Sequence, residues 1–195
     1  MQTTTNLRKM TGTAMLAAVA TVLMFIDFSV PFMPSFIKLD ISELPALLAG
    51  FAYGPLAGTA VCLIKNLINL LRTTTGAVGE MCNFLMGVCF VVPAALIYKH
   101  KKSRRSALIG AGIGALAMAL LSVPVNYFIT YPIYQNFMPL DAIIGMYQAI
   151  LPGVDGLLQC LVVFNLPFTL VKGLLDAALT FLIYKPLSPI LHGKH

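Results

Sequence analysis

Lys172 is one of two lysines that stand inside apolar stretches of this 195-residue chain. Ionisable groups at membrane depth are costly, so they are functional candidates by default. Lys172 lies in the run PFTLVKG, with Thr169 one helical turn before it and Asp176 one turn after it. Two interpretations stay open. Lys172 forms an internal ion pair with Asp176, or it faces a cavity beside Thr169 and donates hydrogen bonds to a polar ligand.

Lys65 is the second lysine, and it lies in the run KNLINLL between apolar residues. Asn66 and Asn69 stand beside it, and side-chain amides can bridge helices in an apolar setting. The run therefore predicts either a polar clamp between helices or a ligand contact.

Three further polar residues fall near the expected outer ends of apolar segments. Asn126 follows Pro124, and its amide offers donors and an acceptor together, which suits an imide or amide edge on a planar ligand. Glu80 and Asn83 lie about one turn apart in GEMCNFLMG. A plain helix-capping role is the alternative for Glu80, because an acid in the first turn interacts favourably with the helix dipole.

Motifs for catalysis or metal binding are not visible in the sequence. There is no P-loop, HExxH, GxSxG or aspartate pair for magnesium. The four cysteines lie singly in apolar surroundings without a CxxC pair, so we interpret them as small buried hydrophobic residues. They are Cys62, Cys82, Cys89 and Cys160. A membrane enzyme would have to be built from residues such as Glu80, Lys65 and His100.

The elements that must position these residues are membrane helices. Hydrophobic residues make up 58% of the chain and charged residues 10%, far fewer than the roughly one quarter of a soluble domain. This excludes both a soluble globule and a disordered chain, and it predicts one membrane domain over 1–195. The net charge of +6 indicates topology and contact with anionic lipids, with no nucleic-acid partner.

Counting apolar blocks gives five helices, but the basic residues require six. Nine of the thirteen basic residues flank three places: residues 8–9, residues 99–105, and the segment after residue 184 that holds Lys185 and Lys194. If all three places are cytoplasmic, as the positive-inside rule requires, an even number of crossings separates the first two. Gly54-Pro55 breaks the 28-residue block 44–71, which as a single helix would span about 42 Å. The prediction is therefore an all-α bundle of six transmembrane helices with both termini cytoplasmic. The expected helices cover 11–30, 44–53, 56–71, 81–98, 107–131 and 157–184.

Two connections between these helices are expected on the outside, 31–43 and 132–156. Both are rich in apolar and aromatic residues, so they could pack over the open end of the bundle as lids. The alternative is that they lie in the headgroup interface, where tyrosine is favoured.

The first helix carries Ala14, Ala17 and Ala18, and the spacing of Ala14 and Ala18 leaves a shallow groove for another helix. From the residues alone, both internal packing and docking of a partner remain open.

Four segments of the chain resemble the substrate-binding S components of energy-coupling factor (ECF) transporters, specifically the riboflavin-specific members of RibU type. They are MPSFIKLDISELPALLAGFAYGPLAG, KNLINLL, GEMCNFLMG and PFTLVKG. The resemblance implies a six-helix binder that holds riboflavin in its outer half, with no cofactor of its own, and leaves open whether FMN also binds. It further implies transport together with a transmembrane coupling subunit and two cytoplasmic ATPases in the cell membrane of a prokaryote, and it favours Ala14, Ala17 and Ala18 as the docking site of the coupling subunit.

The resemblance also implies which residues bind the ligand. In relatives an asparagine of the fifth helix and an asparagine and a lysine of the sixth hold the flavin ring. The matching positions are Asn126 and Lys172, whereas Thr169 stands in place of the second asparagine. Asn165 lies one turn further outward and could substitute for it. The remaining expected contacts lie in the matching segments, at Phe36, Leu39, Asp40, Glu80 and Asn83. The alternatives are an S component for another vitamin or precursor and, from a different class, a membrane enzyme.

Overall fold

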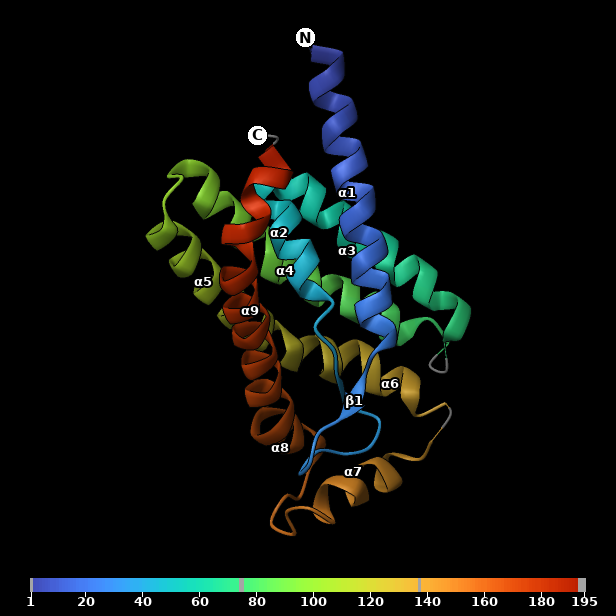
Figure 1. Ribbon diagram of the computed structural model, residues 1–195. Coiled ribbons are helices and arrows are strands. Elements are labelled where there is room, and N and C mark those ends of the chain that lie inside the picture. The colour runs from blue at the N-terminus through green and yellow to red at the C-terminus, as the bar shows by residue number, and fades with distance from the viewer. Residues whose placement is uncertain (1, 74–75, 137, 193–195) are drawn as a thin grey trace.

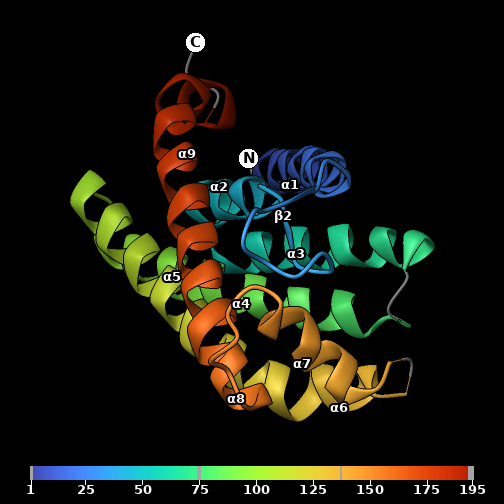
Figure 2. The ribbon, with the colours of Figure 1, turned by 90° about the horizontal axis from the view of Figure 1, so that it is seen from below.

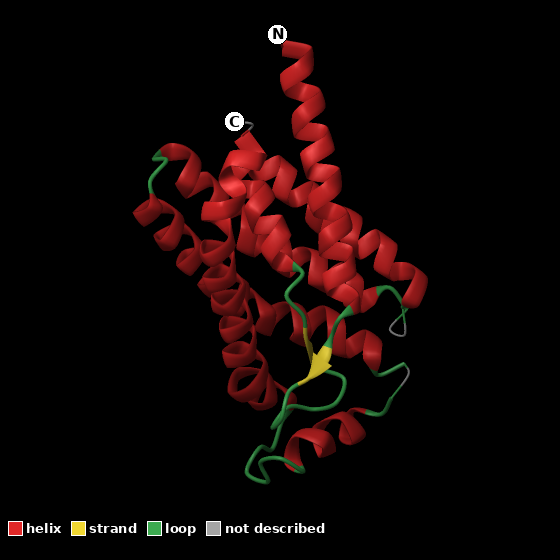
Figure 3. Cartoon of the chain, in the orientation of Figure 1, coloured by secondary structure: helices red, strands yellow, loops and turns green. Residues whose placement is uncertain are grey.

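The computed structural model describes residues 2–73, 76–136 and 138–192, and this part of the chain is mostly helical (Figures 1 and 3). Lys194, one of the basic residues that fix the expected topology, lies outside the described residues. The long helices are α1 (Gln2–Phe25), α2 (Glu43–Tyr53), α3 (Pro55–Asn69), α4 (Val78–His100), α5 (Arg104–Val125) and α9 (Leu166–His192). The shorter ones are η1 (Leu70–Arg72), η2 (Asn126–Thr130), α6 (Tyr131–Tyr134), α7 (Leu140–Gln148), α8 (Leu157–Cys160) and η3 (Leu161–Asn165).

Within the described ranges, four helical segments are long and apolar enough to cross a membrane. They are Asn6–Phe25, Val78–His100, Arg104–Tyr134 and Leu157–Tyr184. The break at Gly54 is where the sequence places it: α2 ends at Tyr53, α3 begins at Pro55, and Gly54 between them has φ of 105°. This left-handed backbone favours glycine, and proline is well suited to the first position of the helix that follows.

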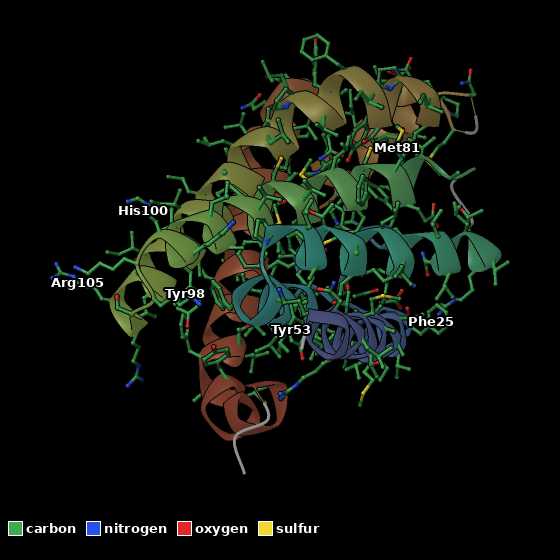
Figure 4. The ribbon with its side chains drawn as sticks, turned by 90° about the horizontal axis from the view of Figure 1, so that it is seen from above. Phe25, Tyr53, Met81, Tyr98, His100 and Arg105 are labelled. Carbon is green, nitrogen blue, oxygen red and sulfur yellow. The ribbon has the colours of Figure 1, made fainter. Side chains whose placement is uncertain are left out.

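The bundle has two distinct ends (Figure 1). The start of α1, the end of α9 and the turn between α4 and α5 lie at one end, which we call the basic end because Arg8, Lys9 and the basic residues of 99–105 belong to it. Viewed onto the bundle in Figure 4, His100 and Arg105 extend outward at its edge. The opposite end carries a β-hairpin, α7 and α8 (Figure 1), which Figure 2 shows from below, and we call it the hairpin end.

The hairpin corrects the expected first helix, 11–30. α1 ends at Phe25, and β1 (Phe28–Ser29) pairs antiparallel with β2 (Lys38–Leu39). Asp27 adds an ion pair to the hairpin, since Lys38 Nζ lies 3.0 Å from its Oδ1. The first connection is thus an ordered hairpin.

Two large apolar cores, with a small third cluster around Val78, Cys82 and Val125, hold the described part of the chain together. The larger core joins the helices α1–α5 and α9 and includes Leu47, Val61 and Phe90, which are fully buried. A second core at the hairpin end is built around Tyr131 and Tyr147, and Met33 and Ile37 of the first connection pack against it. Residues of both expected lid segments, among them Ile37 of the first and Ile143 and Tyr147 of the second, therefore pack together at this end of the bundle.

Two π-helical turns interrupt the long helices at the hairpin end. In η2 the Tyr131 N–H donates to the Asn126 carbonyl, and in η3 the Leu166 N–H donates to the Leu161 carbonyl. Each turn directly precedes a residue followed by proline, Pro132 or Pro167. Proline has no N–H and its ring crowds the carbonyl four residues earlier, so the wider turn accommodates the missing bond. Such turns are frequent at functional sites.

Candidate functional site

A cavity of about 230 Å³ opens near the hairpin end, between the first connection, α4, η2, α6 and α9. Five of the nine expected ligand contacts line it, and they come from segments far apart in the sequence. They are Phe36, Asn83, Asn126, Asn165 and Thr169. The other four, Leu39, Asp40, Glu80 and Lys172, do not line this cavity.

The asparagines at the cavity wall lie on the two π turns, Asn126 as the first residue of η2 and Asn165 as the last of η3. Asn126 Nδ2 donates to the Ser122 carbonyl at 2.8 Å, which leaves the Asn126 carbonyl as its acceptor for a ligand. Asn165 Oδ1 accepts a hydrogen bond of 2.8 Å from the Tyr147 hydroxyl. Both amides are therefore oriented by the protein.

Asn83 and Glu80 of α4 both face α3, Asn83 at the cavity wall and Glu80 outside the lining of the cavity. Asn83 Nδ2 donates to Asn66 Oδ1 at 3.2 Å, and the Asn66 amide donates to the Cys62 carbonyl at 2.8 Å. Glu80, in the first turn of α4, is buried and accepts hydrogen bonds from Asn69 Nδ2 at 3.1 Å and from the Thr73 hydroxyl at 2.9 Å. These contacts are those of the helix clamp that the asparagines indicate.

Lys172 pairs with Asp40, and the expected alternative of an ion pair with Asp176 is wrong. Lys172 Nζ lies 2.7 Å from Asp40 Oδ2. Asp40 Oδ1 accepts bonds from the Ser42 N–H at 2.9 Å and from the Ser42 hydroxyl. Both oxygens of Asp176 are buried and have no hydrogen-bond partner among the described residues.

The electrostatics of Asp40 favour its ionised form. Burial alone would raise the pKa of this carboxyl, but the ammonium groups of Lys172 and Lys65 and the hydrogen bonds from Lys172 and Ser42 hold the pKa well below its usual range. Asp40 is therefore a carboxylate that anchors the end of the first connection to α9.

Lys65 is fully buried and lies beside Asp40 and Ser42. Its Nζ donates to Ser42 Oγ at 2.7 Å and to Glu43 Oε1 at 2.5 Å. Glu43, the first residue of α2, is 1% exposed. A Cβ at residue 87 would lie 2.8 Å from the Glu43 carboxylate, so Gly87 on α4 provides the space that this carboxylate fills. We call Asp40, Ser42, Glu43, Lys65 and Lys172 the charge cluster.

Aromatic residues at the hairpin end complete the surroundings of the cavity. The hydroxyls of Tyr131 and Tyr147 are hydrogen-bonded to each other. Phe36 of the first connection packs edge-on against both rings, with centroids 6.5 and 6.0 Å away. The two tyrosines had no role in the expected site, although the aromatic content of the second connection was a signal for packing.

The cysteines are free, and three of the four are buried. Two make polar contacts, Cys62 with Glu43 Oε2 at 3.6 Å and Cys82 with the Thr130 hydroxyl at 3.0 Å. Across the described part of the chain, no group of three His, Cys, Asp or Glu side chains could hold a metal ion.

The three alanines of α1 divide between two environments. Ala17 is 1% exposed and belongs to the core, whereas Ala14 and Ala18 are exposed. Ala14 and Ala18 therefore lie on a surface that another helix can approach, and Ala17 does not.

Comparison with known proteins covers almost the whole chain. The family model described as "ECF transporter, substrate-specific component" matches residues 8–184. The chain belongs to this family. Such a component is part of a transporter, and a long run of apolar helices makes this S component a membrane protein.

Two relatives and one solved structure are similar to this S component over nearly their whole length. The S component is 36% identical to "Riboflavin transporter RibU" of Staphylococcus aureus, over 91% of its own length and 89% of the relative's. It is 33% identical to "Riboflavin transporter FmnP" of Bacillus subtilis, over 94% of both chains. A solved structure of the S component of a bacterial ECF transporter superposes with a TM-score of 0.74 at 34% identity, over 95% of this chain and 98% of that one.

Proposed function

We propose that this S component captures riboflavin from outside the cell in the hairpin-end cavity and mediates its uptake. Two curated relatives that carry the name riboflavin transporter are similar over nine-tenths of the chain or more, which supports this ligand. The observation that carries the proposal is the cavity itself, in which Asn126, Asn165 and Thr169 supply hydrogen-bonding groups beside aromatic residues such as Phe36. A planar ring with a polar edge matches this lining.

The proposed topology has six crossings with both termini in the cytoplasm of a prokaryote. α2 and α3 would be the second and third crossings, joined at Gly54. The basic end would face the cytoplasm, because basic flanking residues favour that side. The hairpin end, and with it the cavity, would then face outward.

Lys172 remains a proposed ligand contact, in a role modified by Asp40. An ammonium group has three donors, and the described bond to Asp40 uses one of them. Lys172 lies one turn from Thr169, so a ligand that reaches past Thr169 would meet the free donors. Leu39, Asp40 and Glu80 would then act on the ligand only through their neighbours.

The experiment that tests the ligand is a titration of riboflavin into the purified protein, followed by flavin fluorescence quenching. We expect saturable quenching, and yellow protein if the ligand survives purification. Asn126→Ala should weaken binding at least about tenfold, because a buried polar group of the ligand loses its partner.

The matched control is Asn6→Ala, since Asn6 is an exposed asparagine of α1, far along the sequence from the cavity residues. This variant should bind as the wild type does. Wild-type protein that neither retains nor quenches riboflavin would reject this ligand in favour of another vitamin or precursor.

The proposed partners are a transmembrane coupling subunit, which Ala14 and Ala18 would contact, and two cytoplasmic ATPases. A large side chain at either exposed alanine would block the close approach of a partner helix. We therefore expect Ala14→Trp and Ala18→Trp to bind riboflavin normally and to lose uptake in cells. Ile113→Trp, at an exposed position of α5, is the control; equal uptake by all three variants would remove the docking role.

A further inference from the structure

Tyr147 is completely buried, although it belongs to α7 in the second connection. Its ring packs against Phe164, with centroids 5.2 Å apart, and its hydroxyl donates to Asn165 Oδ1 at 2.8 Å. A side chain from the outer connection thus reaches an amide that lines the cavity.

The donor and the acceptor in each of these hydrogen bonds follow from the number of hydrogens that a tyrosine hydroxyl carries. A phenol has one hydrogen to donate, and that of Tyr147 goes to Asn165. The Tyr131 hydroxyl must therefore be the donor in its bond to Tyr147. Burial and the neighbouring Tyr131 raise the pKa of Tyr147 well above its usual value, so this phenol keeps its proton.

This chain of bonds fixes what Asn165 can offer to a ligand. The carbonyl of the Asn165 amide is held by Tyr147, so the NH₂ group supplies its donors. Asn126 has the opposite arrangement, because its NH₂ group is held by the Ser122 carbonyl and its own carbonyl remains as the acceptor. The two π turns therefore bring one oriented donor and one oriented acceptor to the same cavity.

We infer that Tyr147 is a positioning residue for ligand recognition, which fixes the Asn165 amide as a hydrogen-bond donor complementary to the acceptor of Asn126. A ring edge with a carbonyl next to an N–H, as in an imide, satisfies both groups. The inference rests on the proposed function. It specifies how the polar edge of the ligand is recognised in this chain, in which Thr169 occupies the position expected for an asparagine.

The arrangement also makes the recognition site depend on both connections. Asn165 is oriented only while α7 is packed against the bundle, and Phe36 of the first connection contacts the tyrosine pair. Release of α7 would free the Asn165 amide to rotate, so loss of the Tyr147 hydroxyl should act mainly on the rate of ligand dissociation.

A double-mutant cycle with Tyr147→Phe and Asn165→Leu tests this inference, with riboflavin as the ligand. We expect Tyr147→Phe to weaken binding about fivefold, the effect of one hydrogen bond of ordinary net strength, with the change in the dissociation rate. In the Asn165→Leu background the same substitution should change the dissociation constant less than about twofold, since coupled residues are not additive. Tyr127→Phe, on the same η2 region but outside the cavity, should bind as the wild type does.

The outcomes separate the two proposals. Wild-type protein that does not bind riboflavin rejects the proposed function and this inference with it. Normal wild-type binding, with an equal loss from Tyr147→Phe in both backgrounds or no loss at all, overturns the inference alone. If Tyr147→Phe does not fold, Tyr131→Phe tests the same chain one bond earlier and should weaken binding about two- to threefold; wild-type affinity in that variant would overturn the inference.

Discussion

The hairpin-end cavity and the charge cluster both place polar groups inside an apolar bundle, but they do so in different ways. The cavity is lined by amides, hydroxyls and apolar side chains together with Lys38, and each asparagine on a π turn has one half of its amide satisfied by the protein. In the charge cluster, Lys65 is bonded to Ser42 and Glu43, and Asp40 is bonded to Ser42 and Lys172. The first arrangement leaves capacity for a ligand, whereas the second uses its capacity internally.

This contrast offers a criterion that distinguishes ligand-binding polar residues at membrane depth from polar residues that stabilise the fold. Cost alone does not distinguish them, because both groups are expensive to bury. The distinction lies in whether the protein itself supplies all the hydrogen-bond and charge partners of the buried polar group. By that criterion Lys65 stabilises the fold, Asn126 and Asn165 are the proposed ligand contacts, and Lys172 stands between the two regions.

The largest effect is expected where the closed network is opened. Lys65→Met would leave the Glu43 carboxylate buried beside Gly87 without its cation, and breaking a buried pair in this way costs about 3 to 5 kcal/mol. Thermal unfolding in detergent should show a large loss of stability.

The matched control removes both charges. Replacing a buried pair by apolar residues is often nearly neutral, so Lys65→Met/Glu43→Leu should recover much of the loss. A single Lys65→Met variant as stable as the wild type would show that the charge cluster is not closed around this lysine.

A smaller and mixed effect is expected at Lys172, which joins the two regions. Lys172→Ala should weaken riboflavin binding at least about tenfold and also lower the melting temperature of the ligand-free protein, because Asp40 loses its partner. Asn126→Ala should lower affinity without the loss in stability. If Lys172→Ala lowers only stability, Lys172 belongs entirely to the charge cluster.

The smallest effect is expected from pH. The pKa of Asp40 is depressed in the folded protein. Its contribution to stability is therefore complete above the ordinary carboxyl pKa of about 4 and is lost only as pH falls through the lower pKa of the folded state. The pKa of Tyr147 is raised, so its donor is lost only at high pH. Riboflavin affinity should therefore change less than about twofold between roughly pH 5 and pH 8, measured by quenching. A titration midpoint inside that range would mean that one of these groups is not held as described.

The sequence was informative where local chemistry decides the structure. Gly54-Pro55 ends one helix and starts the next because of backbone geometry alone, and the spacing of Asn165 and Thr169 puts both on one face of a helix. Asn165 and Thr169 are two of the five expected ligand contacts that line the cavity. The family resemblance added the first connection, from which Phe36 reaches that cavity.

The sequence was uninformative where the partner comes from a distant segment. Asp40 and Lys172 are 132 residues apart, so no local pattern distinguishes this pair from the nearer Asp176. No local pattern pairs Glu43 of α2 with Lys65 of α3 or with the space at Gly87 of α4. Tyr147 lies in a connection whose packing depends on the second core, and that packing is a property of the assembled fold.

The two π turns have a consequence for how the helical faces of this protein are compared with others. A π turn is a helix with one inserted residue, and each residue of an α-helix advances the face by about 100°. The tips beyond η2 and η3 are therefore rotated by about that angle relative to an uninterrupted helix. If η2 wound as a regular α-helix without losing a residue, α6 would rotate by about that angle and would no longer turn Tyr131 and Tyr134 toward the cavity. η2 therefore sets the direction in which α6 walls the cavity.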